Sequence, residues 1–79
     1  MSTNRNKDKE IFLRELGKRV KEIRESKGLS QFQLAIEAEI PKNQVGRIER
    51  GEINTSIYTL KRLANSLTTS VSSLLLFSQ

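Results

Sequence analysis

Residues 28–51 read GLSQFQLAIEAEIPKNQVGRIERG, and this stretch decides the fold of the chain. Apolar residues recur at helical spacing in residues 30–38 and again in residues 42–50, with a short break between them. The pattern predicts two short helices joined by a tight turn. The second helix has an apolar face and a polar, basic face. Such a helix can present side chains to the major groove of DNA, where base edges carry a distinguishable set of hydrogen-bonding groups.

The second helix of the pair, residues 42–50, separates its side chains into two faces. Val45 and Ile48 lie on one side, and the opposite side carries Asn43, Gly46, Arg47 and Arg50, with Lys42 at the helix start. Asn can pair with adenine through two hydrogen bonds, and Arg or Lys can pair with guanine. A glycine on the exposed face would let the backbone approach another surface closely. The alternative is an ordinary solvated helix face.

The first helix of the pair begins with a recognisable cap. Ser30 followed by Gln33 forms a capping box, in which each side chain bonds a backbone N–H at the other position. A small apolar face suited to close helix packing follows, formed by Leu34, Ala35 and Ala38. Gln31 lies in the first turn, beside free amides that bind phosphate well. Its alternative role is that of an exposed helix former.

The flanking sequence predicts three more helices. Residues 8–27 form one, with the core stripe Phe12, Leu16, Val20 and Ile23, and Gly28 ends it. Ser56 caps a helix over residues 57–67 that buries Leu60, Leu63, Ala64 and Leu67, and a last short helix carries Val71, Leu74 and Leu75. Residues 1–8 are too polar to pack and predict a flexible tail, or alternatively a basic arm (Arg5, Lys7, Lys9) that reaches DNA. The prediction is an all-α domain of five helices.

These landmarks together resemble the Cro/C1-type helix-turn-helix family, also called the XRE family. The runs that carry the resemblance are LGKRVKEIRESKGLSQFQLA, QVGRIERG and SIYTLKRLANSL, and they span residues 16–75. The resemblance implies a lambda-repressor-like fold over residues 9–79. It also implies a cytoplasmic, nucleoid-associated protein that binds double-stranded DNA.

Site residues follow from the same resemblance, position by position. The base-reading positions of the family correspond to Lys42, Asn43, Gln44 and Arg47. The phosphate-binding positions correspond to Gln31, Asn54 and Thr55. We add Arg50, which lies on the basic face of the predicted helix over residues 42–50. The resemblance also implies a structural ion pair between Arg24 and Glu49.

The turn departs from the family pattern. Many relatives have glycine where this chain has Glu39, which predicts a left-handed backbone at a residue that tolerates it poorly. Pro41 replaces the usual Ser or Thr and cannot supply a hydroxyl cap. We therefore expect a slightly different entry to the second helix, and a negative charge near the phosphate position.

Composition excludes several classes of function. The chain has 79 residues, enough for one domain, and its net charge of +5 suits an anionic partner. Cysteine and histidine are both absent, which excludes thiolate and histidine metal sites and the corresponding catalytic groups. We expect no enzyme activity, no cofactor and no small-molecule ligand. No apolar run is long enough for a membrane helix, and the N-terminus lacks the apolar core of a secretory signal.

The C-terminal run VSSLLLF places four apolar residues in succession, and one helix face cannot bury all of them. Exposed apolar patches usually mark an interface. We therefore predict a homodimer with Tyr58, Leu75, Leu76 and Phe77 at its interface. The alternative is that Leu76 and Phe77 fold back as ordinary core.

The sequence thus predicts a regulator of transcription that binds an approximately palindromic operator as a homodimer. Restriction–modification controllers, Cro-like phage regulators and antitoxins all fit the resemblance. Two other classes remain open: a protein-interaction module that uses the same fold, and an architectural DNA binder without sequence preference.

Overall fold

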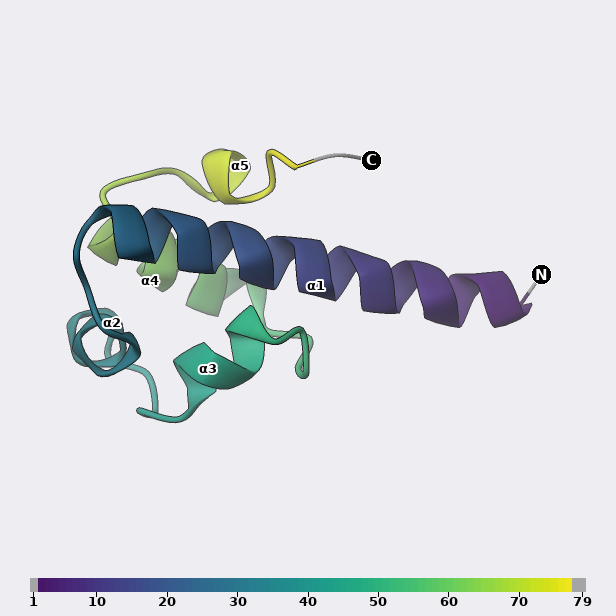
Figure 1. The fold of residues 1–79 in the computed structure, drawn as a ribbon, viewed down its shortest axis with the longest axis horizontal. Helices are drawn as coiled ribbons and strands as arrows, with labels where there is room; N and C mark the ends of the chain where they lie inside the picture. The colour runs from purple at the N-terminus through teal and green to yellow at the C-terminus, as the bar shows by residue number, and fades with distance from the viewer. Residues whose placement is uncertain (1, 78–79) are drawn as a thin grey trace.

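The computed structural model describes residues 2–77. These residues form five helices and no strand: α1 (Ser2–Ser26), α2 (Gln31–Ala38), α3 (Gln44–Glu49), α4 (Ile57–Ser66) and α5 (Val71–Leu74) (Figure 1). The predicted all-α, five-helix fold is confirmed. No helix in this part of the chain is both long and apolar enough to cross a membrane.

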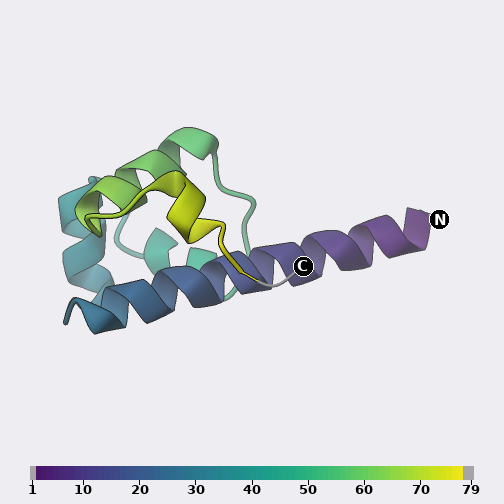
Figure 2. The same cartoon turned by 90° about the horizontal axis from the view of Figure 1, so that it is seen from above.

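Helix α1 begins earlier than the sequence analysis expected. It starts at Ser2, whereas the predicted start was Asp8, so residues 2–8 continue the helix. Neither glycine nor proline interrupts residues 2–16, and helix propagation from a packed segment adds one hydrogen bond for each residue fixed. At 1.5 Å per residue, 25 residues make a helix about 37 Å long, which accounts for the 40 Å long axis of the molecule. Its N-terminal part extends past the other helices (Figures 1 and 2).

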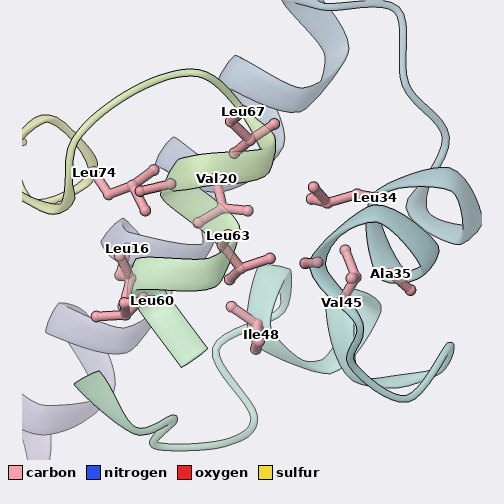
Figure 3. Packing of buried hydrophobic residues seen from close by; sticks show 12 residues of the cluster. Leu16, Val20, Leu34, Ala35, Val45, Ile48, Leu60, Leu63, Leu67 and Leu74 are labelled. Atoms are coloured by element: carbon pink, nitrogen blue, oxygen red, sulfur yellow. The ribbon is translucent and has the colours of Figure 1, made fainter. Parts of the chain in front are cut away.

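The core lies where α1 meets the helix pair and α4 (Figure 3). Its fully buried large side chains are Val20, Leu34, Val45, Leu63, Leu67 and Leu74. One predicted core position differs, because Phe12 is 44% exposed. Phe12 lies at the edge of the core, where its ring meets that of Phe77 edge-on, with 5.3 Å between the centroids.

Helices α1 and α3 touch backbone to backbone at Gly17. A methyl group at this position would overlap the carbonyl oxygens of Ile48 and Glu49. Glycine is therefore required here by space, which the sequence analysis did not anticipate. Two residues further along α1, Arg19 Nε donates to the carbonyl oxygen of Ser73 at 3.0 Å and ties α5 to α1.

The turn between α2 and α3 has the left-handed residue that the sequence predicts. Glu39 has φ 58° and ψ 47°, and the N–H of Ile40 donates to the carbonyl of Ala35 at 3.0 Å. This closes α2 as a left-handed C-terminal cap does. Arg62 of α4 donates to Glu39 Oε1 at 2.9 Å, so the charge of Glu39 is paired.

Helix α3 begins later than predicted. It starts at Gln44, and Lys42 and Asn43 lie in the turn before it. Pro41 precedes this turn. Asn43 is the N-cap residue but makes no side-chain capping bond. The missing hydroxyl cap at Pro41 is consistent with this shortened start.

Candidate nucleic-acid interface

One side of α3 is fixed by the core. Val45 and Ile48 are 0% and 2% exposed. Gly46 is also buried, so its expected place on the exposed face is wrong. A Cβ atom at Gly46 would lie 3.2 Å from Gln31 Oε1 and 3.0 Å from Arg50 Nη1. The glycine therefore lets a side chain of α2 lie directly against α3.

A buried ion pair ties α3 to α1. Arg24 Nε donates to Glu49 Oε2 at 2.6 Å, and Arg24 Nη2 donates to Glu49 Oε1 at 3.1 Å. Arg24 Nη1 also donates to the carbonyl of Leu29 at 2.7 Å, which fixes the loop before α2. The hydrogen bond to Glu49 raises the pKa of Arg24 above its ordinary value, against the opposing effect of burial. The structure thus brings together the pair that the sequence resemblance implied.

Gln31 extends this network to α2. Its Nε2 donates to Glu49 Oε1 at 2.9 Å, so the Glu49 carboxylate receives bonds from both α1 and α2. The Gln31 residue itself is exposed at the start of α2. Its amide nitrogen carries two hydrogens, and this bond uses one of them. The side chain is oriented by Glu49 while it borders the surface where phosphate was expected.

The expected base-reading residues differ in exposure. Lys42, Asn43 and Arg47 are exposed, and Gln44 is half-buried. The Lys42 ammonium lies 5.9 Å from the centre of the Phe32 ring, a cation–π distance. Lys42 and Asn43 lie in the turn just before α3, and Arg47 lies on the exposed side of the helix, whose other side is buried through Val45 and Ile48.

A carboxylate that the sequence analysis did not single out lies among the arginines. Glu52 Oε2 accepts from Arg50 Nε at 2.7 Å, and Glu52 Oε1 is 3.4 Å from Arg50 Nη2. Arg47 Nε lies 3.7 Å from Glu52 Oε1. The hydrogen bond from Arg50 lowers the pKa of Glu52 and the same bond raises the pKa of Arg50. Glu52 lies two residues after Arg50 and five residues after Arg47 in the sequence, and this spacing is the signal that could have identified it.

The loop after α3 gives the two predicted phosphate contacts different surroundings. Asn54 is exposed. The Thr55 hydroxyl is buried, with no hydrogen-bond partner among the described residues. Thr55 instead borders a cavity of about 400 Å³ between α1, α4 and α5, also lined by Phe12, Leu60 and Leu75. A phosphate contact through this hydroxyl does not fit the geometry.

The predicted interface residues fall into two groups. Tyr58 and Leu76 are 62% and 70% exposed, and Leu75 is 38% exposed. Phe77 is half-buried against Phe12, so it folds back onto α1 as the alternative expectation had it. Leu76 does not. An apolar surface therefore remains at the end of α5, and Leu75 and Ile57 line the cavity beside it.

Comparisons with known proteins match this geometry. The helix-turn-helix family model HTH_3 matches residues 20–74. The structure is similar to the restriction-modification controller protein C.AhdI from Aeromonas hydrophila, with 37% identity and a TM-score of 0.77 over 78% of this chain and 94% of that chain. It is also similar to an HTH_3 family transcriptional regulator from Vibrio cholerae, with 33% identity and a TM-score of 0.79 over 84% of this chain and 37% of that chain.

A relative by sequence is the immunity repressor protein of Bacillus phage phi105, which is 37% identical over 59 residues. These residues make up 75% of this chain, and the match spans 41% of that repressor. Residues 20–74, which the family model matches, contain the helix pair, the Arg24–Glu49 pair and the loop after α3. The chain belongs to the Cro/C1-type, or XRE, helix-turn-helix family of transcriptional regulators.

Proposed function

We propose that this protein reads the sequence of duplex DNA with Lys42, Asn43, Gln44 and Arg47, and acts as a homodimer on an approximately palindromic operator. The observation that carries the proposal is the contrast between the two sides of α3. Its inner side is held by the core and by the Arg24–Glu49–Gln31 network. Its outer side and the turn before it offer the exposed groups of Arg47, Lys42 and Asn43. Side chains on a rigid, pre-positioned helix lose little freedom on binding, which favours affinity.

The phosphate backbone would be held around this helix. Gln31 lies at the N-terminus of α2, where free backbone amides favour an anion. Arg50 and Asn54 are exposed beyond α3 and supply a cation and an amide. Phosphate contacts fix the register of the protein on DNA without reading its sequence.

The homodimer rests on the apolar surface formed by Tyr58, Leu75 and Leu76, to which Phe77 adds its half-buried edge. Two-fold symmetry would place the two copies of α3 about one DNA turn, roughly 34 Å, apart. The similarity to C.AhdI along nearly that whole protein favours a restriction–modification controller among the candidate roles. The phage immunity repressor supports a phage regulator as the second candidate. Either role would place the protein in the cytoplasm with the bacterial DNA.

The direct test is selection of duplexes from a random library at roughly physiological salt. The proposal expects an enriched inverted repeat with half-sites about 10 base pairs apart. Retention without enrichment would favour an architectural DNA binder, because phosphate contacts alone do not select sequence. No retention would favour a protein-interaction module.

Arg47→Ala tests the assignment of the reading face on the selected operator. We expect a loss of about 1–3 kcal/mol in binding free energy, with relaxed preference at one base pair of each half-site. Gln31→Ala is the comparison and should weaken binding to every duplex alike. Titrations on the operator and on single-base variants would measure both effects. An Arg47→Ala protein with unchanged sequence preference would contradict the assignment.

A further inference from the structure

Glu52 pairs with two arginines, Arg47 of α3 and Arg50, which caps the C-terminal end of that helix. It lies three residues after the end of α3, within 2.7 Å of Arg50 and 3.7 Å of Arg47, measured from carboxylate oxygen to guanidinium Nε. All three side chains are about half exposed, at 47%, 58% and 51% for Glu52, Arg50 and Arg47. They therefore share one patch of solvent-facing surface at the C-terminal end of α3.

The contact between Glu52 and Arg50 uses the same groups that would hold a phosphate. Arg50 presents Nε and Nη2 to the two carboxylate oxygens, the fork arrangement in which arginine also binds phosphate. A guanidinium whose fork faces a carboxylate must exchange that partner before the same fork can face DNA. The Glu52 charge also offsets one of the two positive charges of the patch, which weakens the attraction to the backbone.

From this geometry we infer that Glu52 competes with DNA phosphates for Arg50 and so limits the sequence-independent affinity of the protein for duplex DNA. This inference rests on the proposed function, because it assigns a regulating residue to the same surface. Of the proposed base-reading residues, Lys42 and Asn43 form no ion pair with Glu52, and Arg47 Nε lies 3.7 Å from the carboxylate, against 2.7 Å for Arg50 Nε. The competition therefore falls chiefly on Arg50. The competition therefore acts on the part of binding that does not depend on sequence.

The experiment measures the affinity of Glu52→Gln for a random-sequence duplex as a function of salt concentration. Glu22→Gln is the matched control, because Glu22 is an exposed residue of α1 and forms no ion pair with another described residue. Both variants change the net charge equally. We expect Glu52→Gln to bind about fivefold more tightly at low salt, with a slope of log K against log salt that steepens by about one. Glu22→Gln should change the affinity less than about twofold.

A double-mutant cycle with Arg50→Gln separates this competition from a general charge effect. In the natural background Arg50→Gln should cost less than about twofold, because Glu52 already occupies the arginine. In the Glu52→Gln background the same change should cost about fivefold. Equal costs in both backgrounds would overturn the inference, as would weaker binding by Glu52→Gln. Failure of the natural protein to bind any duplex at low salt would instead overturn the proposed function.

Discussion

At the scale of single residues, the Glu49 carboxylate decides how the helix pair is held. It lies on α3 and accepts hydrogen bonds from Arg24 of α1 and Gln31 of α2. Its side chain is 2% exposed and that of Arg24 is 8% exposed. A buried ion pair contributes little net stability compared with apolar side chains of similar volume, but loss of one partner leaves the other charge buried and unpaired. The pair therefore fixes the geometry more than it adds to stability.

We expect Glu49→Gln to lower the free energy of unfolding by about 3–5 kcal/mol, because the Arg24 guanidinium loses its counter-charge inside the protein. Urea denaturation followed by far-UV circular dichroism measures this loss. Glu22→Gln is the control and should stay within about 0.5 kcal/mol of the natural protein. Replacing both partners, with Arg24→Met and Glu49→Leu together, should cost less than Glu49→Gln alone. A Glu49→Gln loss below about 1 kcal/mol would contradict the buried-charge account.

At the scale of elements, the turn between α2 and α3 stores strain that a single change should release. Glu39 has a positive φ of 58°, and the left-handed region costs a non-glycine residue roughly 1–2 kcal/mol. The exposed bond from Arg62 offsets this by about 0–1 kcal/mol. Glu39→Gly releases this strain, but it loses the ion pair and adds the larger entropy of glycine in the unfolded chain, about 0.5–1 kcal/mol. We therefore expect a small net rise in the free energy of unfolding, of up to about 1 kcal/mol.

Urea denaturation of Glu39→Gly beside Arg62→Ala tests this expectation. Arg62→Ala removes the same ion pair but keeps the strained glutamate, so it should be neutral or destabilising. Were Glu39→Gly also destabilising, the backbone strain at this turn would be smaller than the ion pair and the entropy of glycine together.

The elements themselves were predictable because their signals are local. Ser30 and Gln33 form the expected capping box, and Ser56 caps α4 as predicted. The errors came from information that is not local. No residue in the sequence marks where α1 begins, so its first turns were missed. Gly46 was expected on the exposed face, but it is buried with Gln31 of α2 against it.

The candidate site divides in the same way. The exposed positions of α3 follow from helical periodicity, and the Arg24–Glu49 pair followed from the resemblance. Glu52 and Gly17 could not be identified from periodicity, because their importance depends on which atoms lie opposite them in space. Thr55 was predicted to contact phosphate from its place in the loop. Its hydroxyl is instead buried beside a cavity that α1 also lines, which the local sequence does not show.

At the scale of the whole molecule, the proposed homodimer depends on apolar side chains that the single chain leaves at its surface. Leu76 is 70% exposed at the end of α5, and Tyr58 is 62% exposed in the first turn of α4. Burial of a leucine side chain contributes about 1.5–3 kcal/mol, and two-fold symmetry doubles the contribution. The dimer should therefore be sensitive to a charge at Leu76.

We expect Leu76→Lys to raise the dissociation constant of the dimer by at least about a hundredfold, as measured by sedimentation equilibrium. Ile36→Lys is the matched control, because Ile36 is 60% exposed on α2 and away from the predicted interface residues. It introduces the same charge and should leave the dissociation constant within about twofold. Operator affinity should fall with Leu76→Lys because one half-site contact no longer supports the other. Equal dissociation by both variants would place the interface elsewhere, and a natural protein that sediments as a monomer would remove the homodimer from the proposed function.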